Sequence, residues 1–89
     1  MSEIFELSWS SAARRAVAKD LPEAVAAAVL ELVLGPLREN PYRVGKPLRE
    51  PFEGVWSARR ATYRVLYRIN EEERTVLIEA IKHRGDAYR

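Results

Sequence analysis

One stretch near the middle of the chain, VWSARRATYRVLYRI at residues 55–69, carries the clearest structural pattern. Its second half alternates aromatic or branched apolar residues with mostly basic ones, which is the period-two pattern of a strand with one buried face. We therefore predict that the aromatic face is buried. A short turn near residues 60–62 lets the first half pair with this strand antiparallel, which places Trp56 in the core and Arg59 beside Arg64 on the open face.

The N-terminal part of the chain predicts a strand followed by a short helix. Residues 3–9 alternate between polar and apolar positions and are predicted to form the strand. Ser10 or Ser8 can cap a helix that runs to about Lys19, because a serine hydroxyl accepts a hydrogen bond from a free amide of the first turn.

A second helix is predicted over residues 22–34, which makes the two helices a hairpin. Asp20 is expected to be its N-cap, with Pro22 in the first turn. Its buried face is expected to consist of Val25, Val29, Leu32 and Val33. Gly35 can end the helix and Pro36 can restart a last turn to about residue 40, and a kinked continuous helix is the alternative.

The remaining segments predict a loop, a turn and a final strand. Pro41 and Pro47, with Gly45 between them, indicate an extended loop. Residues 70–73 are predicted to form a polar turn. Residues 75–82 carry apolar side chains on both faces, so they are predicted to form a central strand of the sheet.

These elements predict an α+β fold. An N-terminal strand and a two-helix hairpin pack on one face of a mostly antiparallel sheet that is completed by three C-terminal strands. The other face of the sheet, to which Arg59 and Arg64 point, is expected to be exposed.

Length and composition favour one small domain that spans residues 1–89, since the chain has 89 residues. There is no cysteine, so no disulfide framework or thiolate site is expected. No segment resembles a membrane span or a signal peptide, which leads us to expect a cytoplasmic protein without a membrane partner. We also expect no cofactor and no structural metal.

The charges are distributed unevenly along the chain. The formal net charge is only +2, but residues 42–68 contain seven Lys and Arg against two Glu. A cationic patch on a weakly charged body is typical of proteins that bind a polyanion, because clustered Lys and Arg contact phosphates. The alternative is an ordinary solvated loop and strand face.

The sequence lacks most known catalytic motifs. It has no glycine-rich phosphate loop, no cluster of metal ligands and no Ser-His-Asp or cysteine nucleophile set, and its single histidine excludes a two-histidine ribonuclease mechanism. The remaining candidates are arginine, tyrosine, lysine and one histidine. These groups can stabilise a pentavalent phosphate and transfer a proton to a leaving oxygen.

The chain resembles the RelE side of the RelE/ParE superfamily of bacterial toxins. The resemblance rests on residues 48–54, on Trp56-Ser57-Ala58-Arg59-Arg60, on Tyr63-Arg64-Val65-Leu66-Tyr67 and on the ending His83-Arg84-Gly85-Asp86-Ala87-Tyr88-Arg89. It spans nearly the whole chain. Gly35-Pro36-Leu37 and the segment from Asn40-Pro41 to Gly45-Lys46-Pro47-Leu48 resemble actinobacterial members.

The resemblance implies which residues act on RNA. Arg64 matches the arginine that contacts the scissile phosphate, and Arg59 resembles a second phosphate-binding arginine. Arg84 and Tyr88 match the C-terminal arginine and the tyrosine that stacks on or orients the mRNA base. His83 lies where some relatives place a proton-transferring histidine. Further contacts with RNA or the ribosome are expected from Arg43, Lys46, Arg49, Arg60, Arg68 and Lys82.

One departure from the family pattern concerns the general base. Family members often carry lysines on the strand before the hairpin, on the parity of Arg59, where this chain has Val55 and Ser57. Lys46, Lys82 or His83 can substitute, or the ribosome can position the 2′-hydroxyl well enough for a weak base to suffice.

The function implied by the resemblance is that of a type II toxin that enters the ribosomal A site and cleaves mRNA. Its expected partners are the ribosome, the mRNA and a cognate antitoxin. Two alternatives remain open. One is a ParE-like module that inhibits DNA gyrase without catalysis, and the other is a degenerate toxin that acts only as a complex-forming partner.

Overall fold

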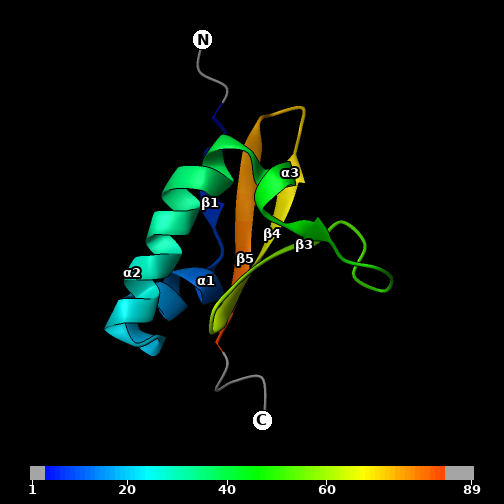
Figure 1. Ribbon diagram of the computed structural model, residues 1–89. Coiled ribbons are helices and arrows are strands. Elements are labelled where there is room, and N and C mark those ends of the chain that lie inside the picture. The colour runs from blue at the N-terminus through cyan, green and yellow to red at the C-terminus, as the bar shows by residue number, and fades with distance from the viewer. Residues whose placement is uncertain (1–3, 84–89) are drawn as a thin grey trace.

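The computed structural model describes residues 4–83 and is built around a five-stranded sheet (Figure 1). The strands are β1 (Glu6–Trp9), β2 (Lys46–Pro47), β3 (Trp56–Arg60), β4 (Tyr63–Asn70) and β5 (Thr75–His83). Their order across the sheet is β1-β5-β4-β3-β2. β1 runs parallel to β5, and every other neighbouring pair is antiparallel. β5 is therefore an interior strand, as its two apolar faces predicted.

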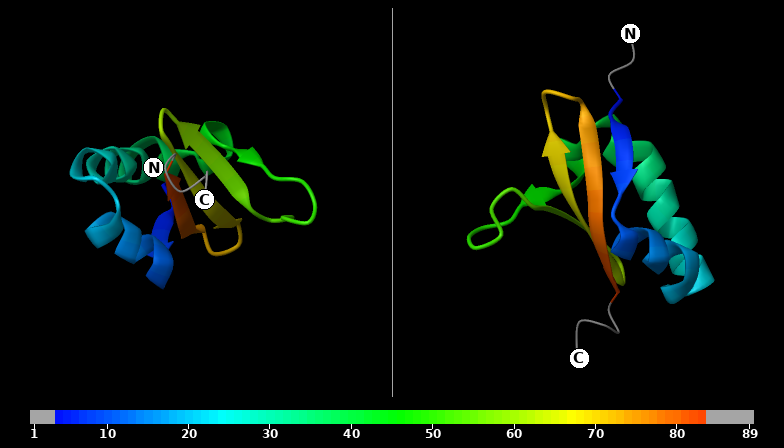
Figure 2. Two further views of the ribbon diagram at one scale, coloured as in Figure 1. Left: turned by 90° about the horizontal axis from the view of Figure 1, so that it is seen from below. Right: turned by 180° about the vertical axis from the view of Figure 1, so that it is seen from behind.

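The helices form a second layer. They are α1 (Ser11–Arg15), α2 (Glu23–Leu32) and α3 (Pro41–Val44), and two π-helical segments, η1 (Ala16–Asp20) and η2 (Val33–Leu37), continue α1 and α2. α1 and α2 lie on one side of the sheet (Figure 2). The predicted α+β architecture is confirmed, and the short α3 and β2 are additions to it. None of the helices in residues 4–83 is long and apolar enough to cross a membrane.

β4 confirms the alternation that the sequence predicted. Its buried residues are Tyr63, Val65 and Tyr67, and its exposed basic ones are Arg64 and Arg68. The two buried tyrosines still need partners for their hydroxyl groups, because an unpaired buried hydroxyl is costly. Tyr67 donates a hydrogen bond to the Pro41 carbonyl at 2.6 Å, and Tyr63 donates to the Ala28 carbonyl at 3.3 Å. These bonds tie the central hairpin to the helical layer.

The first helix of the hairpin begins as predicted, but the second helix begins at a different residue. The Ser10 hydroxyl accepts a hydrogen bond from the Ala13 amide at 3.0 Å, which confirms Ser10 as the cap of α1. The prediction of Asp20 as the N-cap of α2 is wrong. Asp20 ends η1, and α2 begins at Glu23 without a side-chain cap. Leu21, which precedes a proline, is extended, and this places Asp20 too far from the first turn of α2.

α2 and η2 form one continuous helical segment, which is the kinked alternative of the prediction. Pro36 lies inside η2, where a wider turn accommodates a residue without an amide hydrogen. Val29, Leu32 and Val33 are buried as predicted, whereas Val25 is only half-buried.

The segment predicted as an extended loop contains α3 and the edge strand β2. Pro41 is at the start of α3, and Gly45 ends it. A Cβ atom on Gly45 would lie 2.8 Å from the carbonyl oxygen of Ser57, and closer still to the hydroxyl of Tyr67. Glycine is therefore required here for space, because β2 can pair with β3 only if the chain passes this close to it.

Three smaller predictions also need correction. β1 begins at Glu6, and Phe5 before it is buried and exchanges two hydrogen bonds with Arg38. Val55, expected on the open face, is buried because it lies before the paired part of β3. Trp56 is only half-buried, and it stacks on Tyr67 with ring centroids 6.5 Å apart.

Candidate nucleic-acid interface

Three cations stand side by side on the face of the sheet opposite the helices. Arg59 on β3 is paired with Arg64 on β4, and Arg64 is paired with Lys82 on β5. Directly opposed residues point to the same face, with Cβ atoms about 4.5–5.5 Å apart. All three residues are exposed. We term this set the cationic row.

A β-bulge brings Lys82 into the cationic row. The register between β4 and β5 shifts between Leu66 and Tyr67, so that Leu66 is paired with Ala80 and Tyr67 with Ile78. Glu79 is the extra residue, and it reverses the alternation along β5. The apolar residues on both parities of this strand therefore reflect a bulge as well as an interior position.

The cationic row carries unneutralised charge. Like charges placed directly opposite each other destabilise a sheet. Within residues 4–83, no carboxylate forms an ion pair with Arg59, Arg64 or Lys82. Arg68, farther along the same face, is instead paired with Glu79 at 2.5 Å. An anionic ligand on the cationic row would relieve a repulsion that the described part of the fold leaves in place.

A fourth cation, Lys46, borders the cationic row. β2 pairs Lys46 with Ser57, so both residues face the open side of the sheet. They lie two residues along β3 from Arg59, a step of about 7 Å at the rise of an antiparallel strand. Ser57 is one of the two positions where the family resemblance leads us to expect a lysine. Lys46 therefore places an amine beside Ser57, where the family pattern has a lysine and this chain does not.

The other predicted catalytic residues do not join this set in the described structure. His83 is paired with Tyr63 at the end of β5, so it shares the parity of the core face and points away from the cationic row. Arg84 and Tyr88 lie outside the described residues.

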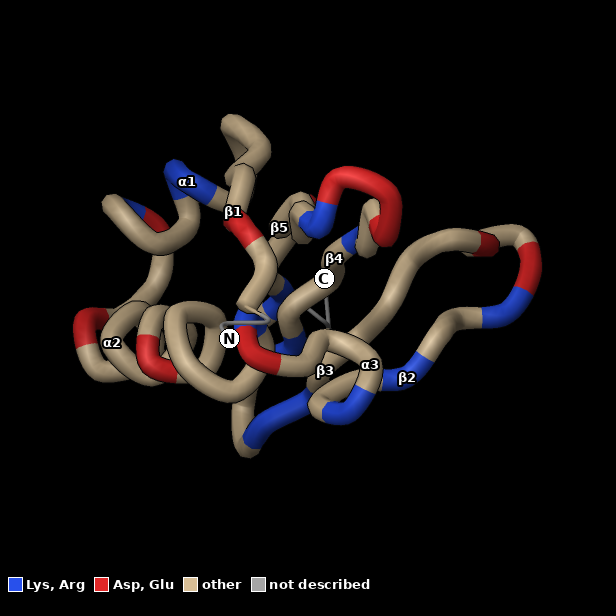
Figure 3. Tube along the Cα trace, turned by 90° about the horizontal axis from the view of Figure 1, so that it is seen from above, with Lys and Arg blue, Asp and Glu red and all other residues tan. Residues whose placement is uncertain are grey.

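The remaining predicted RNA contacts are divided between two sides of the sheet. Arg60 has the opposite parity from Arg59, and with Arg43 it lines a hollow of about 530 Å³. Arg49 is in the exposed loop between β2 and β3. Basic segments of β3, α3 and β2 follow one another along one edge of the molecule (Figure 3).

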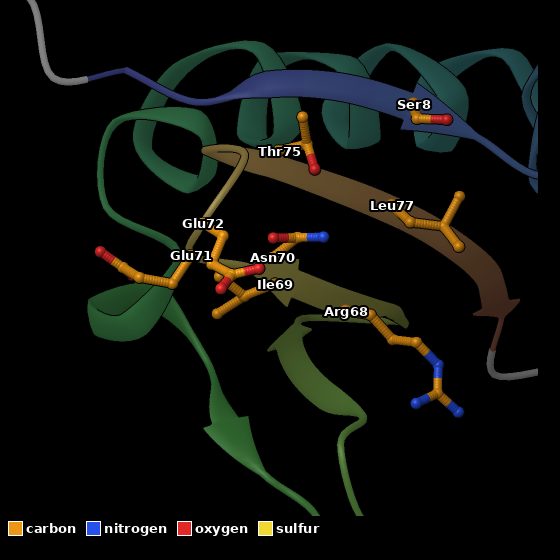
Figure 4. Close-up of a pocket in the computed structure, with 8 residues that line it drawn as sticks. All are labelled: Ser8, Arg68, Ile69, Asn70, Glu71, Glu72, Thr75 and Leu77. Atoms are coloured by element: carbon orange, nitrogen blue, oxygen red, sulfur yellow. The ribbon is translucent and has the colours of Figure 1, made fainter.

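The opposite end of the open face is acidic. A second hollow of about 540 Å³ is lined by Ser8, Arg68, Ile69, Asn70, Glu71, Glu72, Thr75 and Leu77. Figure 4 shows the guanidinium of Arg68 at the far end of this hollow from Glu71 and Glu72. Glu71 also accepts hydrogen bonds from Tyr42 and Arg74. The open face is thus polarised, with its unpaired cations near the β3–β4 turn and its acids near the β4–β5 turn.

The buried tyrosines are not suited to proton transfer near neutral pH. Burial raises the pKa of Tyr67 to about 12, although the nearby Arg60 guanidinium opposes the rise. Burial also raises the pKa of Tyr63. A hydrogen bond to Glu71 raises the pKa of Tyr42 at the other end of the sheet. Tyr63 and Tyr67 therefore remain protonated donors within the core.

The arrangement on the open face can stabilise charge on a phosphate. Two guanidinium groups and a neighbouring amine offer donors to the oxygens of a phosphodiester, and a guanidinium can bind two of them at once. Lysine amines at Lys82 and Lys46 can also exchange protons with a nearby hydroxyl. Within residues 4–83, no group of three or more His, Cys, Asp or Glu is placed to hold a metal ion.

Comparison with known families identifies the chain. The sequence pattern of the family described as "ParE toxin of type II toxin-antitoxin system, parDE" matches residues 5–88. The chain belongs to this family. The match covers the five strands and three α-helices that residues 4–83 of this ParE-family toxin form, together with the cationic row.

Two relatives support the assignment to RelE-like toxins. Toxin RelG of Mycobacterium tuberculosis is 48% identical over 85 residues, which cover 96% of this chain and 97% of RelG. Toxin RelE of the same organism is 52% identical over 69 residues, which cover 78% of this chain and 71% of that toxin. The resemblance noted in the sequence is confirmed, and this ParE-family chain is a toxin of a type II toxin–antitoxin system.

The fold of this ParE-family toxin has also been observed in a crystal. The toxin–antitoxin complex RelBE2 from Mycobacterium tuberculosis contains a chain that matches with a TM-score of 0.86 and 46% identity, covering 91% of this chain and 99% of that chain. The RelE-like α+β fold is therefore shared with a solved relative.

Proposed function

We propose that this toxin is a ribosome-dependent endoribonuclease that cleaves mRNA in the ribosomal A site. The observation that carries the proposal is the cationic row, in which Arg59, Arg64 and Lys82 converge on the open face without a carboxylate partner in the described structure. Its relatives named RelE and RelG support the same choice.

The proposed reaction is transfer of the phosphoryl group to the adjacent 2′-hydroxyl. The 2′-oxygen bonds to phosphorus, the bond from phosphorus to the 5′-oxygen breaks, and the products are a 2′,3′-cyclic phosphate and a 5′-hydroxyl. Arg64 and Arg59 would stabilise the charge that develops on the phosphorane oxygens, where preorganised donors have their largest effect.

Two proton transfers accompany this reaction. Lys46 and Lys82 both face the open side. We propose that one of them, in its neutral amine form, accepts the proton of the 2′-hydroxyl while the ribosome holds the reacting groups in line. Arg84 would assist departure of the 5′-oxygen, and Tyr88 would orient the mRNA base. His83, which the sequence also suggested for this role, is left out because it lies on the core face of β5. Arg49 and Arg68 would contribute to the electrostatic attraction toward RNA.

We also propose a cognate antitoxin as the protein partner. The related RelBE2 structure is a toxin–antitoxin complex. An antitoxin segment that brings carboxylates to the cationic row would neutralise the charges that the described residues leave unpaired, and it would block access of RNA. The toxin and its antitoxin would meet in the cytoplasm, where the ribosomes are.

The proposal is tested with purified toxin and ribosomes programmed with a defined mRNA. We expect cuts at A-site codons, mapped from the 3′ ends, and none in the same mRNA without ribosomes. A parallel assay measures supercoiling by DNA gyrase. If the toxin leaves mRNA intact on ribosomes and inhibits gyrase, the endoribonuclease proposal is wrong.

The gyrase inhibitor remains the second candidate for a specific reason. The family that matches residues 5–88 is the ParE toxin family, and the family lysines expected on β3 are replaced by Val55 and Ser57. A degenerate toxin, inactive in both assays yet able to bind an antitoxin, would be the third outcome.

A further inference from the structure

A second cationic site lies on the other side of β3 from the cationic row. Arg43 of α3 and Arg60 of β3 line the hollow of about 530 Å³, and its remaining lining residues are Pro36, Glu39, Asn40 and Val44. We term it the cationic hollow. Both arginines are exposed, and within residues 4–83 neither forms an ion pair, even though Glu39 lines the same hollow.

One of the two arginines is held in place. The Nη1 atom of Arg60 donates a hydrogen bond to the carbonyl of Arg59 at 2.8 Å. A guanidinium has five N–H donors, so this bond orients the side chain and leaves most of its donors for a ligand. Arg60 is paired with the buried Tyr63 and lines the hollow with Arg43 of α3, which places its side chain on the helical side of the sheet.

The two cationic sites meet at a free edge of the sheet. β2 is paired with Trp56 and Ser57, so among residues 4–83 no further strand lies beside Arg59 and Arg60 on this edge. Arg60 is paired with Tyr63 across the two-residue turn, and the amide and carbonyl of Arg59 therefore point outward along this edge. Consecutive residues of a strand point to opposite faces, so Arg59 and Arg60 reach opposite sides of the same edge.

We propose that the cationic hollow is a second phosphodiester-binding site, and that the RNA backbone passes over the free edge of β3 between it and the cationic row. The inference rests on the proposed endoribonuclease function, and it adds a binding contact away from the cleaved phosphate. Arg43 and Arg60 take the phosphate oxygens, and the Asn40 amide adds a neutral polar group.

The hollow favours a phosphate over other anions for two reasons. It presents two guanidinium groups, which match phosphate geometry through paired N–H donors. It also lies next to the site proposed for the scissile phosphate. RNA bound at that site would bring further phosphates close to the hollow, either from the same strand or from ribosomal RNA. Glu39, which also lines the hollow, limits how much negative charge the hollow can accept.

The test uses two double variants that remove the same charge. Arg43→Gln/Arg60→Gln removes the hollow's cations, and Arg14→Gln/Arg15→Gln removes two exposed arginines from α1 as the matched control. Equal thermal unfolding midpoints establish that all the proteins are folded. Affinity for programmed ribosomes and single-turnover cleavage are then measured over a range of salt concentrations.

We expect the hollow variant to bind ribosomes on the order of five-fold more weakly than the control at 0.1 M salt. The slope of log affinity against log salt concentration should be shallower by about 0.7 for each phosphate contact that is lost. Its cleavage rate at saturation should stay within about two-fold of wild type, because the lost contact does not act on the transition state. If the two double variants behave alike, or if the hollow variant loses cleavage rate at unchanged affinity, the second-site proposal is wrong.

A neutral linkage identifies which RNA supplies the phosphate. Methylphosphonates are placed one at a time on either side of the A-site codon, and ribosomes whose mRNA ends before the A site serve as the second arm. An mRNA phosphate is identified if one neutral linkage weakens ribosome binding by the wild-type toxin but not by the hollow variant. A ribosomal RNA phosphate is identified if the weaker binding of the hollow variant persists on ribosomes without A-site mRNA.

Failure of the proposed function gives a different result. Wild-type toxin that neither binds nor cleaves on ribosomes would refute the proposed function itself, before any variant is compared.

Discussion

Arg64 is the residue at which catalysis and folding can be separated. It follows the buried Tyr63 on β4 but is itself exposed, so Arg64→Ala should leave the fold intact. If its guanidinium stabilises charge on the phosphorane, single-turnover cleavage should fall by about 10²–10³-fold. Ribosome affinity should fall much less, because several other cations share the electrostatic attraction. The two quantities are measured on the same programmed ribosomes.

Arg64→Lys and Arg14→Ala are the controls for this change. The lysine should restore only part of the lost rate, since a point charge cannot reproduce the fork of guanidinium donors. Arg14 is exposed on α1, and its loss should leave cleavage unchanged. Cleavage that is indifferent to Arg64→Ala would remove Arg64 from the proposed site.

Tyr67 provides a pH-dependent test of the core. Its folded-state pKa of about 12 lies above the ordinary tyrosine value near 10, so the folded protein retains a proton that the unfolded chain releases. This contribution to stability is fully present below pH 10 and is lost as the pH rises to about 12. Urea unfolding of wild type should therefore show a decrease on the order of 2 kcal/mol across this interval from Tyr67 alone.

Tyr67→Phe isolates that contribution from the other titrating groups. At neutral pH the variant should be less stable by about 1–3 kcal/mol, because the Pro41 carbonyl loses a buried hydrogen bond. Between pH 10 and 12 the gap between wild type and variant should narrow. A gap that stays constant over this interval would contradict the raised pKa.

At the scale of one element, α2 offers a matched pair of leucines. Leu32 is 6% exposed and packs in the core, whereas Leu34 just beyond it in η2 is 53% exposed. Leu32→Ala should lower the free energy of unfolding by about 2–5 kcal/mol, a large part of what a small domain has. Leu34→Ala should change it by about 0.5 kcal/mol or less. Denaturant titration of both variants measures the difference, and equal losses would mean that the helix packs through another face.

At the scale of the whole molecule, the polarised open face predicts how toxicity is controlled. Expression of the chain alone should arrest growth, and co-expression of an acidic antitoxin should restore it by covering the cationic row. The complex should dissociate more readily as salt is raised, because exposed charges are screened. Growth counts and complex affinity are measured together. A folded chain that is harmless at high expression would contradict an active toxin and favour the degenerate alternative.

Local sequence pattern was sufficient for the central hairpin. The alternation along β4 follows from the two-residue repeat of a strand and from the cost of exposing aromatic residues, so it placed Arg64 and Arg59 on the open face and Tyr63 and Tyr67 in the core. The hydroxyl of Ser10 at the start of α1 was equally predictable, because capping involves only neighbouring residues. The family resemblance then supplied the identity of the fold.

Other parts of the site depend on contacts between distant segments. Lys82 joins Arg64 only because the bulge at Glu79 shifts the parity of β5, and Lys46 reaches the open face only because Gly45 lets β2 approach β3. The cationic hollow likewise joins Arg43 of α3 to Arg60 of β3. The bulge in β5, the close approach of β2 to β3 and the position of α3 beside β3 are all set by packing between segments that are distant in the sequence. They leave no periodic pattern along the chain, so the folded structure alone reveals them.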